Sequence, residues 1–237
     1  MTRGKTILFC TSWDDGYRQD AKIAGLLDRF NLKGTFFVTV NYGIKGLTRT
    51  EIRNLATNHE IGSHTLNHPD LAKIPKDIAA YEITQSKNSL EAMVDREIES
   101  FCYPFGRYNS SVVEIVKKAG YKFARTTGRL NMNLIENRYL IAPTFAVVPR
   151  LISIQTMKAF LQSPLRALLY VAKPEFEIIS RVNKKGIFFH LWGHSWDIER
   201  CDYWGRLASF FSYVSENYKI RPVTFSELVK KYTEDSY

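Results

Sequence analysis

The chain alternates short apolar runs with longer amphipathic runs, and this alternation limits its possible folds more than any other feature. The apolar runs are rich in β-branched and aromatic residues, which is typical of buried strands. The expected strands cover residues 6–12, 34–40, 60–63, 100–103, 121–127, 139–147, 186–192 and 221–224. The expected helices cover residues 20–30, 48–58, 76–95, 110–119, 153–172, 202–217 and 225–232. Such alternation predicts an α/β fold, a parallel sheet of seven or eight units closed or nearly closed into a barrel with helices outside, in one domain over residues 1–237.

The composition excludes several classes of protein. Hydrophobic residues make up 45% and charged residues 24%, which argues against disorder, collagen and coiled coil. No apolar run approaches the roughly 20 residues of a membrane span, so we expect no transmembrane segment. Three widely spaced cysteines, Cys10, Cys102 and Cys201, match no zinc ribbon or redox pair. They indicate reduced thiols, and with no signal peptide recognised we expect a cytoplasmic protein.

The excess of positive charge does not identify a partner. Lys and Arg number 33 against 24 acidic residues, a net charge of +9 that suits an anionic membrane, a phosphorylated substrate or simply solubility. No run of four basic residues and no known nucleic-acid motif occurs, so we expect no nucleic-acid partner. Residues 157–173 are basic and amphipathic, and they lie either on an anionic membrane surface or on the barrel as an outer helix.

Polar residues gather where the expected strands end, which is where barrels carry their active sites. The four-residue spacing of His64 and His68 predicts that both imidazoles lie on one side of a helical turn and bind one metal ion. Asp15 adds an oxygen ligand and leaves positions open for water and substrate. Asp14 is then a candidate general base. Taken singly, the histidine pair is more often ordinary surface or core histidines, and Asp-Asp-Gly is more often a turn or helix cap.

The segments TSWDDG, HTLNHP and YPFG, in this order, resemble the polysaccharide deacetylase family, also called the NodB-homology or carbohydrate esterase family 4. The resemblance extends over residues 6–230. It implies a distorted (β/α) barrel that hydrolyses an N-acetyl group of an amino sugar and releases acetate. It also implies that Asp14 is the catalytic base and that the divalent metal, usually zinc, is held by Asp15, His64 and His68.

The resemblance assigns further roles and shows one clear departure. The backbone N–H of Phe105 would help to stabilise the oxyanion, and Tyr103 of the same motif would contact substrate. Cys102 stands where the family has an arginine that orients the base. Arg125, at the end of the next expected strand, is our candidate to pair with Asp14 and keep it ionised; the alternative is a purely structural ion pair.

The late segment FFHLWGHSWD offers two histidines for the family's general acid. His190 and His194 share one face of a regular strand, and we favour His194 because it lies at the mouth of the barrel. Trp192 would then meet the acetyl methyl group. Trp196 and Asp197 are candidate sugar contacts, although aromatic rings also simply pack.

The sequence therefore predicts a metal-dependent N-deacetylase of an amino sugar in a glycan or glycan precursor. Without an export signal, we expect a lipid-linked or nucleotide-linked sugar as substrate. Two alternatives stay open at this point. One is a metal-free carbohydrate-binding protein of the same fold, which the cysteine at position 102 suggests. The other is a C–N hydrolase that acts on a non-sugar amide, since one fold hosts several chemistries.

Overall fold

A parallel sheet forms the centre of the molecule in the computed structural model, which describes residues 6–128, 137–147 and 187–234. The strands follow the order β5–β4–β3–β2–β1–β7–β6, and β8 also pairs with β1. Every pairing between them is parallel. The strands are β1 (Ile7–Asp15), β2 (Gly34–Val38), β3 (Glu60–Ser63), β4 (Ser100–Cys102), β5 (Phe123–Arg125), β6 (Phe145–Val147), β7 (Ile187–Gly193) and β8 (Ile220–Val223).

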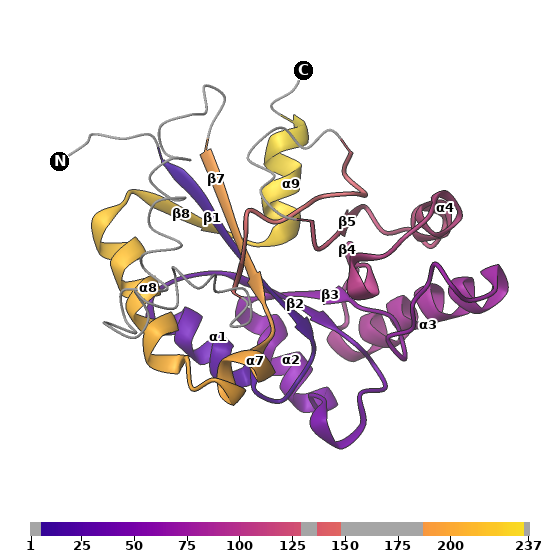
Figure 1. Ribbon diagram of the computed structural model, residues 1–237, viewed down its shortest axis with the longest axis horizontal. Helices are drawn as coiled ribbons and strands as arrows, with labels where there is room; N and C mark the ends of the chain where they lie inside the picture. The colour runs from indigo at the N-terminus through magenta and orange to yellow at the C-terminus, as the bar shows by residue number, and fades with distance from the viewer. Residues whose placement is uncertain (1–5, 129–136, 148–186, 235–237) are drawn as a thin grey trace, which may run out of the picture.

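Strand β1 is the axis of the sheet and is buried along all nine residues. It runs beside β7 through the middle of Figure 1. Its first half pairs with β8 and its second half with β2, so two strands share one of its edges. The strand extends beyond the predicted end at residue 12 and includes Asp14 and Asp15. Burial from both sides explains why the sequence reads as a continuous apolar run.

Between β5 and β6 the ring of strands closes through an irregular segment. Arg125 bridges Ile141 in parallel, and the N–H of Thr126 donates to the carbonyl of Ile141 at 2.8 Å. Farther on, the N–H of Thr144 donates to the carbonyl of His190 at 2.9 Å. Of the strand expected over residues 139–147, only the last three residues are regular, and this irregular seam makes the barrel distorted. That residues 1–237 form one domain stays a prediction.

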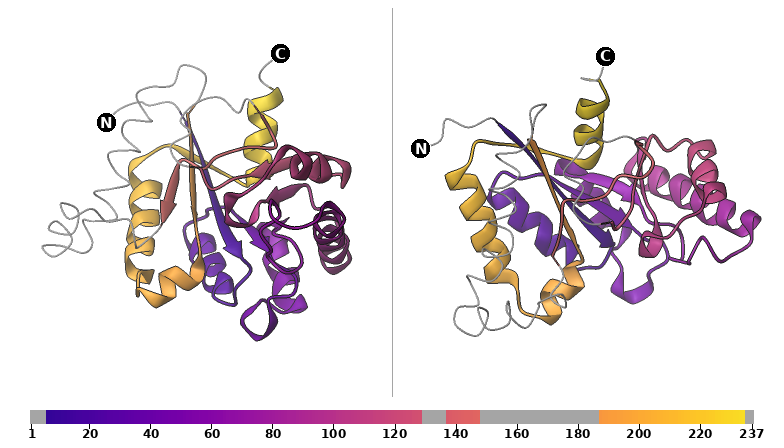
Figure 2. Two further views of the ribbon diagram at one scale, coloured as in Figure 1. Left: turned by 45° about the vertical axis from the view of Figure 1, so that its right-hand side comes forward. Right: turned by 45° about the horizontal axis from the view of Figure 1, so that its top comes forward.

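The helices surround the sheet, with α1 and α2 on one side, α3 and α4 beyond β4, and α8 near β7 (Figures 1 and 2). They are α1 (Asp20–Arg29), α2 (Arg49–Asn58), α3 (Lys76–Val94), α4 (Ser110–Lys118), α7 (Ser195–Arg200), α8 (Trp204–Asn217) and α9 (Phe225–Glu234), with short 3₁₀ turns η1 (Gly43–Lys45) and η2 (Pro104–Gly106). The sequence did not indicate α7, and the helix expected from residue 202 begins at Trp204. The expected helix 153–172 and the candidate membrane segment 157–173 lie outside the described residues.

Two further expectations concern cysteines and membrane spans. All three cysteines lie in the described part of the chain and none forms a disulfide, with Cys10 and Cys102 buried. Within the ranges that the structure describes, no helix combines the length and apolar character required to cross a bilayer.

Candidate active site

The loop after β3 holds the two candidate metal-binding histidines in a strained backbone. Thr65 and His68 have φ angles of 71° and 58°, and Asp15 at the end of β1 has φ 82°. Left-handed backbone is costly for such residues, above all for β-branched threonine, and it concentrates at functional sites. The prediction of a helical turn between His64 and His68 is wrong: this segment is a loop, in which the His68 N–H donates to Thr65 Oγ1 at 2.9 Å.

Glu82 of α3, which is not among the predicted site residues, fixes this loop. Its carboxylate accepts the N–H groups of Leu66 and Asn67 at 3.0 and 2.9 Å, and the Asn67 side-chain amide at 2.5 Å. Glu82 is buried on the same helix face as Ala79 and Ile83. A carboxylate on an otherwise apolar face needs internal partners, and that signal in the sequence would have revealed it.

Asp15, His64 and His68 direct one atom each to a common point. Asp15 Oδ1 lies 3.7 Å from His64 Nε2 and 3.4 Å from His68 Nε2. The two Nε2 atoms are 3.1 Å apart. Ligands bound tetrahedrally to zinc at about 2.0–2.1 Å lie about 3.4 Å from one another. The three atoms therefore fit one face of a tetrahedron, which leaves the fourth position open for water or substrate.

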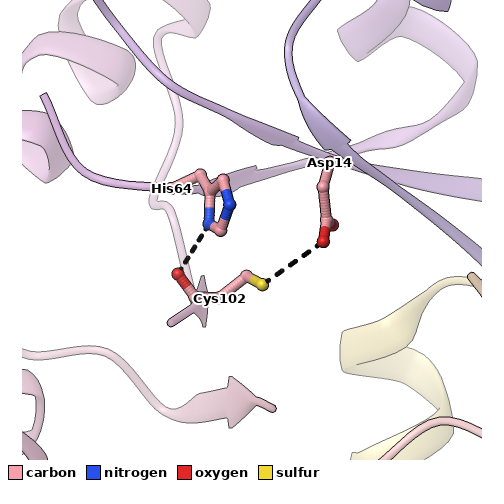
Figure 3. A group of neighbouring side chains, drawn as sticks. All are labelled: Asp14, His64 and Cys102. Carbon is pink, nitrogen blue, oxygen red and sulfur yellow. Dashed lines mark hydrogen bonds between the residues drawn. The ribbon is translucent and has the colours of Figure 1, made fainter. Parts of the chain in front are cut away.

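The tautomer of His64 is set by its second nitrogen. Its Nδ1 lies 2.8 Å from the carbonyl oxygen of Cys102 (Figure 3). Since a carbonyl only accepts, Nδ1 must carry the hydrogen, and Nε2 presents a free lone pair to the metal position. Burial lowers the pKa of His64 to about 4, so the ring is neutral near pH 7. The donor set and its protonation thus suit a divalent metal.

Asp14 is held as a buried carboxylate by Arg125. The Nη2 group of this fully buried arginine donates to Asp14 Oδ1. The rings of Phe37 and Trp192 lie 5.1 and 5.0 Å from the guanidinium carbon and cover it. Burial alone would raise the pKa of Asp14, but the charge and hydrogen bond of Arg125 hold it below its usual value. The carboxylate is therefore ionised.

Cys102 completes this arrangement. It lies directly opposite Arg125 in the pairing of β4 with β5. Its Sγ accepts from Arg125 Nη2 at 3.0 Å and lies 3.8 Å from Asp14 Oδ2 (Figure 3). Burial raises the pKa of the Cys102 thiol, so it stays protonated and directs its hydrogen to the carboxylate. The resemblance expects an arginine at position 102 on β4. Here the guanidinium that bonds Asp14 comes from Arg125 on the neighbouring strand β5.

The two late histidines have different surroundings. His190 is fully buried, with Nε2 2.8 Å from Ser12 Oγ, and burial lowers its pKa to about 3. His194 precedes α7, and its side chain is 22% exposed, with Nδ1 3.6 Å from Asp197 Oδ2. Burial opposes protonation of His194, but Asp197 and then Asp14 outweigh it, and its pKa is raised. His194 is thus the one able to carry a proton near neutral pH.

The five candidate substrate contacts do not all reach the mouth of the site. Phe105 in η2 is 55% exposed, and its ring lies 4.6 Å from that of His68. Phe105 and Gly106 both have positive φ angles, 58° and 67°, and a Cβ on Gly106 would lie 2.0 Å from Thr127 Oγ1. Tyr103 is fully buried against Phe101, so its side chain is closed to a ligand.

The remaining three support other side chains. Trp192 is buried over Arg125, and Asp197 pairs with Arg200. The indole N–H of Trp196 donates to Asp15 Oδ2 at 2.8 Å. These contacts make Trp192, Trp196 and Asp197 neighbours of the proposed catalytic residues, and a role for each in binding sugar stays a prediction.

Comparison with known proteins identifies the family and agrees with the fold. A family model described as polysaccharide deacetylase matches residues 2–124 of 237, just over half of the chain. YxkH of Bacillus subtilis (strain 168), named as a polysaccharide deacetylase, is 29% identical over 120 residues, which are 49% of this chain and 43% of that protein. This chain spans less than half the length of the curated relatives it matches.

Solved structures extend the likeness in fold to nearly the whole chain. A Mycobacterium smegmatis structure named for a polysaccharide deacetylase has a TM-score of 0.70 at 16% identity and covers 99% of this chain and 93% of that one. Wild-type BA3943 of Bacillus anthracis, described as a pseudoenzyme of carbohydrate esterase family 4, has a TM-score of 0.56 at 15% identity, with coverage of 94% and 66%. On the family match, the chain belongs to the polysaccharide deacetylase family.

Proposed function

We propose that this protein is a metal-dependent hydrolase that removes N-acetyl groups from an amino sugar in a glycan or glycan precursor. One observation carries the proposal: Asp15, His64 and His68 direct their ligand atoms to one point, beside an ionised Asp14. Zinc is the metal we expect, because two imidazoles and a carboxylate are its usual catalytic donors. Membership of a deacetylase family supports the same activity.

A zinc ion held by these three residues would act as a Lewis acid and lower the pKa of bound water toward about 7. Asp14 would accept the proton of the attacking water, and its bond with Arg125 supports this role because it keeps the carboxylate ionised and oriented. The Phe105 N–H makes no hydrogen bond with the described part of the chain, and we assign it to the carbonyl oxygen under attack. His194 then donates a proton to the leaving nitrogen, and acetate and a free amine are released.

The substrate we propose is an N-acetylated sugar. The name of YxkH points to a polysaccharide as the broad class. A lipid-linked or nucleotide-linked sugar and a cytoplasmic location stay predictions from the sequence. The net charge of +9 suits such anionic carriers.

The test is acetate release from N-acetylglucosamine oligomers and from acetylated sugar precursors. Turnover should require zinc, stop on chelation and disappear in Asp14→Asn. Glu114→Gln, a similar change at an exposed ion pair on α4, serves as the control and should behave as the wild type. If zinc-loaded protein releases no acetate from any sugar of the panel, the proposal is wrong.

A metal-free carbohydrate-binding protein is the second candidate. It is favoured by the cysteine at position 102 and by the fold likeness to BA3943, which is itself described as a pseudoenzyme. It predicts glycan binding with no metal retained after dialysis and no acetate. Acetate released from simple amides and not from sugars would instead indicate the C–N hydrolase of a non-sugar amide.

A further inference from the structure

Trp196 connects α7 to a proposed metal ligand that lies 181 residues earlier in the chain. Its indole N–H donates to Asp15 Oδ2 at 2.8 Å. The other oxygen, Oδ1, is the one directed to His64 and His68. The two carboxylate oxygens therefore have separate partners: Oδ2 accepts from the indole, and Oδ1 faces the metal position.

This hydrogen bond limits the orientations that the Asp15 carboxylate can adopt. The carboxylate is buried, so its lone pairs need partners within the protein. A hydrogen bond to an ionised oxygen is stronger than one between neutral groups. With Oδ2 engaged by Trp196, rotation of the carboxylate away from the histidines breaks that bond, and binding through both oxygens weakens it. The indole thus favours binding through Oδ1 alone.

The Trp196 ring is already in contact with other side chains. The ring of His194 lies 5.1 Å from it and that of Tyr17 6.2 Å, while the guanidinium of Arg200 lies 5.4 Å from its centroid. A ring packed by three neighbours offers little free face for a sugar. The same ring packs against the proposed acid, His194, so movement of α7 would disturb both the ligand and the acid.

We propose that Trp196 is a positioning residue that holds Asp15 in the geometry for metal binding and ties it to the helix that follows His194. The inference rests on the metal site of the proposed function and goes beyond it by assigning a role to a residue outside the three ligands. Partners of this kind, which orient a metal ligand without touching the metal, affect metal affinity strongly.

The test measures zinc affinity by competition with a chromophoric chelator. Trp196→Phe keeps an aromatic ring and loses the N–H, and it should bind zinc about 10–100-fold more weakly. Trp196→Gln restores an N–H donor and should recover part of this loss. Trp204→Phe is the matched control, because its indole N–H also donates to a carboxylate, that of the exposed Glu199, and its zinc affinity should not change.

A double-mutant cycle with Asp15→Asn shows whether the effect passes through Asp15. In that background Trp196→Phe should change zinc affinity by less than about twofold, since interacting pairs are non-additive. If Trp196→Phe lowers zinc affinity equally in both backgrounds, the proposal is overturned. Weaker zinc binding by Trp196→Gln than by Trp196→Phe also overturns it, because the packing of the ring and not the N–H would then support the site. Circular dichroism of the metal-free variants checks that they fold. If Trp196→Phe does not fold, the proposal requires that Trp196→Gln bind zinc with an affinity within about tenfold of the wild type.

Two failures are distinct. Wild-type protein that binds no zinc would refute the proposed function and this inference with it. Wild-type protein that binds zinc, with Trp196→Phe equally tight, would overturn only the role of Trp196.

Discussion

The two sides of the candidate site are held in place by different means. The metal side, defined as Asp15, His64 and His68, has strained local backbone, with positive φ angles at Asp15 and His68, and contacts from Glu82 and Trp196 support it. The acid side, defined as His194 and Asp197, has ordinary backbone, with His194 extended at φ −120° before a short helix. The helix that carries it is tied to distant parts of the chain by Trp196, which bonds Asp15, and by Ser195, which lies at Asp20.

This difference shows where each half of the chemistry is encoded. The family model ends at residue 124 and contains all of the metal side and none of the acid side. A strained loop needs a specific local sequence, so a motif such as HTLNHP survives as a readable signal. The short helix after His194 is held by the contact of Trp196 with Asp15, which no local motif reports. We therefore expect substitutions on the metal side to remove the metal, and those on the acid side to impair catalysis while the metal stays.

The largest effect is expected for His68→Ala. This side chain is 19% exposed, so its removal should leave the fold intact. Loss of one of three ligands should abolish zinc retention and reduce acetate release below detection. Zinc content after dialysis and turnover are the measurements. A variant that keeps stoichiometric zinc would remove His68 from the metal side.

His194→Ala should separate the two sides. We expect acetate release to fall by about 10²–10⁴-fold, the usual contribution of a general acid, with zinc content unchanged. The raised pKa of His194 means that the wild-type rate falls as pH rises through that pKa and the proton is lost. The variant should lack this descending limb. Loss of zinc from His194→Ala would contradict the separation between acid side and metal side.

The parts of the fold that were predicted correctly have local causes. Residues 60–63 form β3 as expected, and α2 begins with the expected capping box, in which Thr48 and Glu51 bond each other. Gly120 follows α4 with φ 86°, the conformation that a helix-terminating glycine supplies. Each of these features is determined by a few neighbouring residues.

The parts that were not predicted depend on contacts between distant segments. Residues 139–144 read as strand, yet they form an irregular seam because they must join β5 to β7. The bond from Trp196 to Asp15 spans 181 residues and the pairing of Arg125 with Asp14 spans 111. The strand-end position suggested the second of these. No periodicity or motif indicates the first.

Arg125→Ala tests the buried charge pair that serves the metal side. Removal of the guanidinium leaves Asp14 buried without its partner, and we expect the free energy of unfolding to fall by about 3–5 kcal/mol. Urea denaturation of the metal-free protein measures it. Arg107→Ala, which breaks a surface pair with Asp70, is the control and should cost much less. If both variants lose the same free energy of unfolding, burial does not make the Arg125 pair more stabilising than the surface pair.

The smallest effect concerns Asp20, a buried carboxyl at the start of α1 that lies near the acid side. Burial raises the pKa of Asp20 well above its usual value, and the Ser195 hydroxyl offsets this only in part. The folded protein therefore binds a proton that the unfolded chain releases, so stability falls as pH rises from the usual aspartate pKa through the raised one.

Asp20→Asn removes this dependence because the amide carries no charge to bury. We expect the variant to melt at a higher temperature than the wild type above that pH window, with a gain of about 1 kcal/mol or about 2–4 °C, and to match it below the window. Asp28→Asn, on the same helix with a side chain 48% exposed, is the control and should not reproduce the gain. A wild type whose stability does not fall with pH, or an Asp20→Asn variant less stable at high pH, would mean that Asp20 is ionised and bonded in the folded protein. The acid side would then include a further buried charge, and its contrast with the metal side would be smaller than the structure indicates.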